Sequence, residues 1–174
     1  MVQAPKQPET TTEKTKNIVN RFRSFGTDDQ LALFYDIYKK MGDSITPAAP
    51  GAANTELTPR LLGEFLNLSN EKQLQIMRNI VERKDTEWSR EYGALTANNQ
   101  LVVWYGWAQE MGNNVVDIPL DYERSSELNN LLQQIEGLEF EEQITVLRQV
   151  ATEMGFTNVK PIASQEETGK TPSL

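Results

Sequence analysis

Apolar residues recur at helical spacing along most of the chain. Ile18, Val19, Phe22 and Phe25 form a first stripe, and Gly26 ends it. No run alternates between apolar and polar residues over the length of a strand. Together with residues that favour helix ends, the pattern predicts an all-α protein. The expected helices span residues 18–25, 27–42, 59–68, 70–84, 86–92, 97–112, 125–138 and 140–155.

The two ends of the chain lack this periodicity. Residues 1–12 are polar, contain prolines and a threonine run, and are predicted to form a disordered arm. Residues 158–174 also combine prolines with polar residues, and are predicted to form a flexible tail. The expected helical domain therefore covers residues 13–157.

Two internal stretches are apolar yet not helical in pattern. Residues 46–53 and 115–120 are rich in small, apolar or proline residues. Surface loops are usually polar, so we expect both stretches to cross the core or to form the wall of a cavity.

One helical motif occurs three times, over residues 27–42, 70–84 and 140–155. Each copy has an acidic residue near its start, then a glutamine and an aliphatic residue, followed by a wide apolar face. Duplicated helical hairpins packed as a bundle explain this pattern without a ligand. The acidic pairs at residues 28–29 and 141–142 are expected to favour the positive end of each helix.

The helix expected over residues 97–112 differs from the others, because apolar residues nearly encircle it. Such a helix is either central to the core or lines an apolar cavity, and the pattern leaves both open. Its tryptophan and tyrosine rings slightly favour a flat conjugated ligand.

Composition excludes several functions. The chain has no cysteine and no histidine, which rules out Ser-His-Asp and Cys-His catalysis and most zinc chemistry. A net charge of −8 opposes binding to nucleic acid. We therefore predict a binding protein rather than an enzyme, with no metal. The chain shows no signal peptide and no run long enough to span a membrane, so a cytoplasmic location is expected.

Two basic features stand out from this acidic background. Lys14, Lys16, Arg21 and Arg23 form a cluster that is either a solvated helix face or a docking patch for an acidic partner. Arg148 is either a surface arginine or a guanidinium at an interface or at the end of a ligand.

Several separated motifs resemble the N-terminal, carotenoid-binding domain of the orange carotenoid protein family. The resemblance runs from about residue 17 to residue 157. The chain as a whole resembles a stand-alone helical carotenoid protein. The motifs are residues 29–33, 48–53, 104–105, 118–122 and 143–156. The resemblance implies two interleaved, discontinuous four-helix bundles around a carotenoid tunnel. It also implies a non-covalently bound keto-carotenoid, such as canthaxanthin or echinenone.

The same resemblance implies which residues form the tunnel wall. Tyr35 stands where the family commonly has tryptophan, so the resemblance does not imply the spectrum or the quenching strength of the pigment. The copy at residues 70–84 contributes no residue to the implied wall, and is expected to be structural. The implied wall residues are Leu31, Tyr35, Tyr38, Met41, Pro50, Leu101, Trp104, Tyr105, Met111, Ile118, Pro119, Tyr122, Ile144, Thr145 and Arg148.

The implied function is photoprotection, by quenching singlet oxygen, excited phycobilisomes or both. An alternative is a carotenoid carrier that exchanges pigment with a partner like the family's C-terminal domain. Another is a ligand-free interaction module that docks through the basic cluster and Arg148. In two-domain relatives the arginine that matches Arg148 contacts the C-terminal domain or the phycobilisome. Action on phycobilisomes would place the protein at the periphery of thylakoids.

Overall fold

The computed structural model describes residues 11–45 and 59–157, and in that part of the chain every regular element is helical. The prediction of an all-α fold is confirmed. The first helix begins at Thr11, slightly inside the arm expected over residues 1–12. The remainder of the arm, residues 46–58 with Pro50, and the tail lie outside the described residues. The elements are α1 (Thr11–Ser24), α2 (Thr27–Ile45), α3 (Pro59–Leu62), the 3₁₀ helix η3 (Glu64–Asn67), α4 (Asn70–Val81), α5 (Glu87–Gly93), α6 (Ala97–Glu110), α7 (Ser126–Glu136) and α8 (Phe140–Thr152).

Short hydroxyl side chains cap the starts of four helices. Ser69, Thr86, Thr96 and Ser125 each accept a hydrogen bond from a backbone N–H three residues further on. Thr86 and Ser125 stand at the first residues of two expected helices, and Ser69 directly precedes the helix expected from residue 70. These bonds satisfy N–H groups that have no partner within the helix, and so fix where each helix begins.

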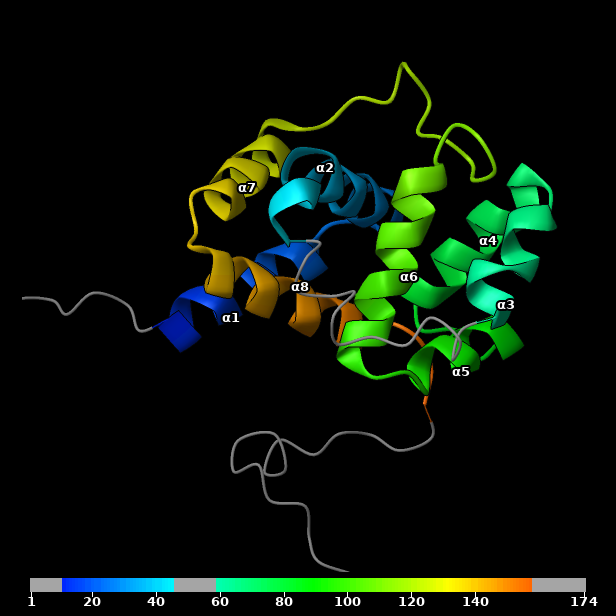
Figure 1. Cartoon of the computed structure of the whole chain (residues 1–174). Helices are drawn as coiled ribbons and strands as arrows, with labels where there is room; N and C mark the ends of the chain where they lie inside the picture. The colour runs from blue at the N-terminus through cyan, green and yellow to red at the C-terminus, as the bar shows by residue number, and fades with distance from the viewer. Residues whose placement is uncertain (1–10, 46–58, 158–174) are drawn as a thin grey trace, which may run out of the picture.

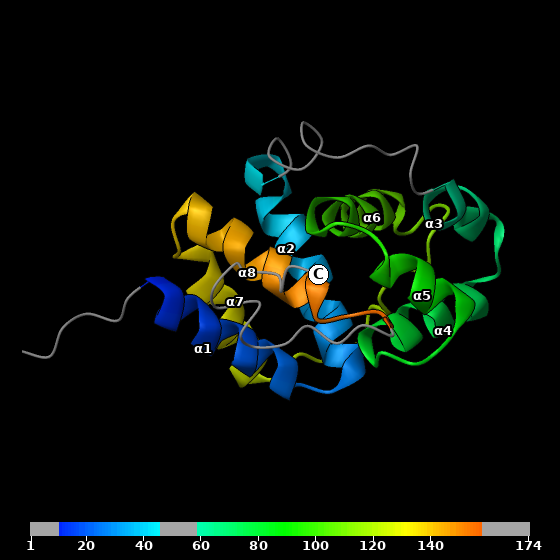
Figure 2. The ribbon, with the colours of Figure 1, turned by 90° about the horizontal axis from the view of Figure 1, so that it is seen from below.

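The helices form two bundles, one built from separate segments of the chain and the other from a continuous segment. Figure 1 shows α1, α2, α7 and α8 on one side, and α3, α4, α5 and α6 on the other; the turned view in Figure 2 agrees. The first bundle is therefore built from the first two and the last two α-helices, while the second uses a continuous stretch. The predicted interleaved arrangement is confirmed, because the first bundle brings together segments from the two ends of the described chain.

Four buried glutamines occupy the same position, the fourth residue of α2, α4, α6 and α8. Each donates its side-chain amide to a backbone carbonyl of the segment that precedes its helix. The bonds run from Gln30 to Phe25 (2.8 Å), Gln73 to Phe65 (3.0 Å), Gln100 to Tyr92 (3.1 Å) and Gln143 to Ile135 (3.1 Å). The repeated motif thus occurs four times, because α6 is a further copy that the sequence pattern did not reveal.

The four copies divide the chain into two similar halves. Gln30 and Gln100 are 70 residues apart, and so are Gln73 and Gln143. Contacts between helices are reciprocal: α2 packs against α4 and α7, while its counterpart α6 packs against α8 and α3. Likewise α1 packs against α8, and α5 against α4. Such reciprocity is the mark of an approximate two-fold relation, with α2 and α6 in contact at its centre.

Aromatic side chains pack on and around α6, and the polar atoms of several of these rings are hydrogen-bonded. Trp104 donates its indole N–H to the hydroxyl oxygen of Tyr92 at 2.8 Å, and that hydroxyl donates to the carbonyl of Ala151 at 2.7 Å. Trp107 donates to the carbonyl of Leu61 at 2.8 Å. Pairing these atoms lets large rings be buried without leaving unsatisfied polar groups.

None of the helices in the described ranges is long and apolar enough to cross a membrane.

Candidate functional site

An apolar cavity of about 170 Å³ lies between α2, α4 and the segment that joins α6 to α7. Its walls come from these three segments, which meet only because the chain interleaves. The lining residues are Asp28, Leu31, Ala32, Tyr35, Leu74, Met77, Arg78, Val116, Asp117, Ile118, Pro119 and Tyr122.

A second cavity, of about 310 Å³, lies further along α2 and reaches α6. The two cavities share Tyr35 and Asp117, so they adjoin along one side of α2, and we call the two together the passage. The second cavity is lined by Tyr35, Tyr38, Lys39, Tyr105, Ala108, Gln109, Met111 and Asp117.

Two buried tyrosines of α2 fix the inner wall of this passage. Tyr35 donates its hydroxyl to the sulfur of Met77 at 2.9 Å, and Tyr38 donates to the carbonyl of Leu101 at 3.1 Å. Burial raises the pKa of both hydroxyls, so both rings stay neutral over the physiological range. The wall is therefore aromatic and uncharged at this point.

Charged and polar groups surround the outer end of the first cavity. Arg78 holds Asp28 through two hydrogen bonds of 2.9 and 3.0 Å, and this bonding raises the pKa of the guanidinium. Tyr122 donates its hydroxyl to Asp29 at 2.6 Å; its pKa is raised mainly by desolvation and further by that hydrogen bond. An open groove outside the cavity shares Asp28, Arg78 and Tyr122 with it, so these residues form a polar mouth.

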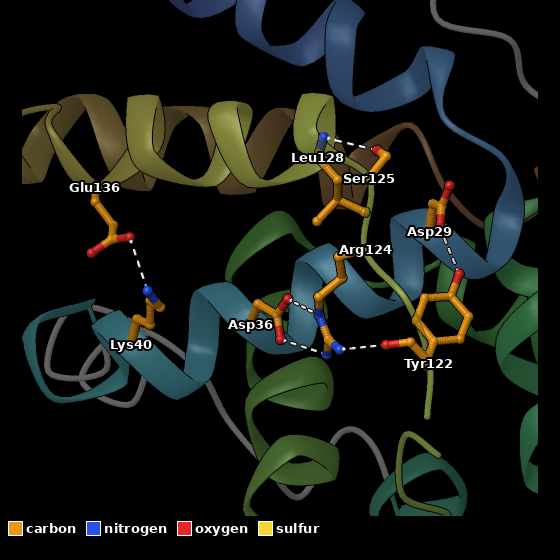
Figure 3. Close-up of polar contacts among 8 residues, drawn as sticks. All are labelled: Asp29, Asp36, Lys40, Tyr122, Arg124, Ser125, Leu128 and Glu136. Atoms are coloured by element: carbon orange, nitrogen blue, oxygen red, sulfur yellow. Dashed lines mark hydrogen bonds and ion pairs between the residues drawn. The ribbon is translucent and has the colours of Figure 1, made fainter. Parts of the chain in front are cut away.

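The segment between α6 and α7 is held in place on both sides of the cavity. Arg124 binds Asp36 of α2 through two hydrogen bonds of 2.6 and 2.9 Å, as Figure 3 shows. That contact raises the pKa of the guanidinium. Nearer α6, the backbone N–H of Val116 donates to Gln73 at 2.8 Å. The expectation that residues 115–120 form a cavity wall is thus supported by residues 116–119, although Leu120 is fully exposed.

The structure brings about half of the implied wall residues together around the passage. The other residues of that set are placed elsewhere or are not described, so their role stays a prediction. Those at the cavities are Leu31, Tyr35, Tyr38, Tyr105, Met111, Ile118, Pro119 and Tyr122. Met41, Leu101, Trp104 and Ile144 are buried in the core, Thr145 and Arg148 are half-buried on α8, and Pro50 lies outside the described residues.

Helix α4 also contributes to the first cavity. Leu74, Met77 and Arg78 line it, whereas residues 70–84 were expected to be structural. The repeat carried the missing signal, because Arg78 and Arg148 are 70 residues apart and hold equivalent positions.

In the part of the chain that the structure describes, no group of three or more acidic side chains is placed to hold a metal ion.

The fold and the site together define an all-α protein whose interleaved bundles line two adjoining cavities, the first of them apolar with a polar mouth. The model of the orange carotenoid protein N-terminal domain matches residues 8–157. The chain belongs to this family, which is not a family of enzymes, and the prediction of a non-enzymatic protein is confirmed.

Relatives of two lengths match the chain. An orange carotenoid-binding domain-containing protein of Nostoc sp. is 40% identical over 88% of both chains. The orange carotenoid-binding proteins of Synechocystis sp. and Limnospira maxima are 39% and 37% identical, but the chain spans only 44% and 45% of their lengths.

Solved structures agree with this assignment. The red carotenoid protein of Anabaena (Nostoc) sp., solved with canthaxanthin bound, matches with a TM-score of 0.74 and 37% identity, over 83% of this chain and 99% of that one. The orange carotenoid protein of the same organism, also with canthaxanthin, gives a TM-score of 0.76 at 31% identity, over 84% of this chain and 48% of that one.

Proposed function

We propose that this protein binds a keto-carotenoid non-covalently along the passage beside α2. The observation that supports this most directly is that an apolar cavity and a second, more polar cavity adjoin at Tyr35 along α2, with tyrosine rings in the walls of both. A carotenoid is a long, rigid and apolar molecule, which such a space fits. Canthaxanthin is bound by two solved relatives of the chain.

The passage offers hydrophobic burial on several sides of a polyene. Each Å² of apolar surface removed from water contributes about 25 cal/mol, so a long polyene can bind tightly with few polar contacts. Stiff tyrosine rings lose little conformational entropy when they pack against a ligand. The protein would thereby hold the pigment planar and fixed in position.

Photoprotection follows from the chemistry of the pigment. A long polyene has low-lying excited states, and so it can accept energy from singlet oxygen or from excited bilin pigments and release it as heat. The protein's part is to position the pigment. We propose that this chain acts in that way in the cytoplasm, with singlet oxygen as the first target and the phycobilisome as the second.

Coexpression in a carotenoid-producing host tests the binding. The purified wild-type protein should be coloured. Ala108→Phe places a ring in the second cavity and should lower the bound pigment about tenfold with little loss of helix. Ala94→Phe, at an exposed residue, should stay coloured. A colourless wild-type protein with intact helical circular dichroism would refute the proposal.

Two further measurements separate the roles of the pigmented protein. It should shorten the lifetime of singlet-oxygen phosphorescence more than the pigment-free form does, and equal lifetimes would count against photoprotection. Fluorescence of purified phycobilisomes tests the second target. The carrier function would be favoured if the pigment passed to a pigment-free partner like the family's C-terminal domain, while singlet-oxygen phosphorescence and phycobilisome fluorescence stayed unchanged.

A further inference from the structure

The chain lacks two of the side-chain types that singlet oxygen attacks most readily. Histidine and cysteine are absent from the whole sequence, so the reactive types that remain are methionine, tryptophan and tyrosine. Tyrosine reacts chiefly as the phenolate, and with an ordinary pKa of about 10 few tyrosines are ionised at neutral pH. Chemical modification of this protein by singlet oxygen therefore falls mainly on its methionines and tryptophans.

The three tryptophans are shielded from such attack. Trp104 and Trp107 have no exposed surface. Trp88 is half-buried, but the guanidinium of Arg60 lies 4.6 Å from the centre of its ring. Singlet oxygen is an electrophile that adds to the face of an indole ring, and a cation held on that face covers it and draws on its electron density. Trp88 is therefore less reactive than its exposure alone would imply.

Three of the four methionines in the described ranges are enclosed by the core. Met41, Met77 and Met154 are 6%, 1% and 2% exposed. Two of their sulfurs also accept hydrogen bonds, that of Met77 from the hydroxyl of Tyr35 at 2.9 Å and that of Met41 from the amide of Gln143 at 3.4 Å. A sulfur lone pair used in this way is less available to an electrophile.

Met111 differs from these three in its surroundings. It lies directly after α6, is half-buried, and lines the second cavity together with Tyr38 and Tyr105. Its thioether is thus accessible from solvent and borders the space in which we propose that the pigment lies. An oxidisable sulfur therefore stands where the pigment would quench the same oxidant.

We propose that Met111 is the side chain that singlet oxygen oxidises in this protein, and that the resulting sulfoxide weakens pigment binding at the second cavity. The site of oxidation follows from composition and burial. The effect on the pigment rests on the proposed function.

The oxidation requires only singlet oxygen and water. The sulfur donates an electron pair to singlet oxygen and forms an S–O bond; water then adds, and the outer oxygen leaves as hydrogen peroxide. One thioether, one oxygen molecule and one water molecule give one sulfoxide and one hydrogen peroxide, so that sulfur loses two electrons and dioxygen gains them. Methionine sulfoxide reductases return the sulfur to the thioether.

The sulfoxide opposes pigment binding because it is polar. Oxidation converts a flexible apolar side chain into one that carries a hydrogen-bond acceptor. Water can satisfy that acceptor in the pigment-free protein, whereas a polyene that covers Met111 removes the water. Burial of an unpaired acceptor costs free energy, so the oxidised protein should bind pigment about tenfold more weakly.

Mapping of oxidised residues in the pigment-free protein tests the first part. The protein is illuminated with rose bengal, a dye that generates singlet oxygen, while catalase removes hydrogen peroxide, and its peptides are analysed by mass spectrometry. Met111 should be oxidised about tenfold faster than Met41, Met77 or Met154, and also faster than Trp88. Equal rates at the four methionines, or faster oxidation of Trp88, would overturn the inference.

Canthaxanthin binding, measured before and after illumination of each pigment-free protein, tests the second part. Wild type and Met154→Leu, the control with a buried methionine replaced, should each lose affinity about tenfold on illumination. Met111→Leu should change by less than about twofold from its own starting value, because leucine has no sulfur to oxidise. Treatment with a methionine sulfoxide reductase should restore the wild-type protein.

A loss in Met111→Leu as large as that in wild type would overturn the inference. So would an unchanged affinity in wild type whose Met111 is shown to be oxidised. Circular dichroism checks folding, and should Met111→Leu not fold, the reductase treatment of wild type still decides the second part. A protein that takes up no canthaxanthin before illumination would refute the proposed function, and would leave the mapping result unaffected.

Discussion

At the scale of single residues, the buried glutamines do more than support their own helices. Gln73 has no exposed surface and makes three bonds: its amide donates to the carbonyls of Phe65 and Asn114, at 3.0 and 2.7 Å, and it accepts from the N–H of Val116 at 2.8 Å. It therefore connects η3 to the segment that walls the first cavity. Leucine at this position would fill similar space and leave these groups unpaired.

Gln73→Leu is expected to lower the free energy of unfolding by about 3 kcal/mol, because buried polar groups lose their partners. Gln75→Leu, two residues away and exposed, should change it by less than about 0.5 kcal/mol. Urea denaturation followed by circular dichroism measures both. Equal effects would show that Gln73 contributes only as a packed side chain.

The buried tyrosines predict how stability depends on alkaline pH. Burial raises the pKa of Tyr38 well above 10.0, its ordinary value, so above pH 10 the unfolded chain loses a proton that the folded one retains. Stability is full below pH 10 and falls above it, by about 1.4 kcal/mol per pH unit for each such group. Tyr38→Phe should make the decline shallower by that amount. Phe34→Leu should lower stability without changing the slope, and parallel slopes for all three proteins would contradict this account.

At the scale of elements, the segment from α6 to α7 is fixed by contacts rather than by regular structure. Its charged clasp, Arg124 with Asp36, joins residues 88 apart in sequence and is largely shielded from water. Figure 3 shows this clasp beside the pair of Lys40 and Glu136, which is exposed. Since Tyr122 lies two residues before Arg124, the clasp also positions the mouth of the first cavity.

Arg124→Met should leave Asp36 unpaired and lower the free energy of unfolding by about 2 kcal/mol. Amide hydrogen exchange over residues 112–123 should quicken at least tenfold. Lys40→Met, which breaks the exposed pair, should change stability by less than about 0.5 kcal/mol and leave that exchange unaltered. Equal exchange in both variants would mean that the clasp does not hold the segment.

Periodicity and cap residues were sufficient to predict the helices, because both signals are local. The fourth copy of the motif, in α6, was not recognised from sequence because apolar residues nearly encircle that helix, so no separate apolar stripe follows Gln100. The wall formed by Met77 could not be inferred from an apolar stripe, which predicts burial but not whether a side chain meets a neighbour or a cavity. The clasp of Arg124 with Asp36 has no local signal, since its partners lie far apart in sequence. The resemblance to a known family, rather than periodicity, pointed to Tyr35 and Tyr38 as wall residues.

At the scale of the whole molecule, neither half of the repeat can complete a bundle by itself. The first bundle takes α1 and α2 from one half and α7 and α8 from the other, and the second takes α3 and α4 with α5 and α6. Each half therefore packs against the other, through the contacts of α1 with α8, α2 with α7 and α4 with α5. We expect the two halves to be stable only together.

Separate fragments 1–84 and 85–174 should each show little helix and no cooperative unfolding, because isolated short helices are marginal in water. Mixed in equal amounts, they should recover helical circular dichroism and a single unfolding transition. A fragment that unfolds cooperatively alone would show that the halves are independent domains, and a mixture that stays unfolded would show that the covalent link between α4 and α5 is essential.

Interleaving also sets the order in which the chain can fold during synthesis. α1 and α2 leave the ribosome first, yet α7 and α8, which pack against both of them, begin only at Ser126 and Phe140. The second bundle, which is continuous, can close while the surfaces of α1 and α2 that face α7 and α8 are still uncovered. Formation of the first bundle must then bring together residues separated by most of the chain, a slow step with a high contact order. The residues that line both cavities all precede Ser126, so a polyene could reach them before α7 and α8 are synthesised.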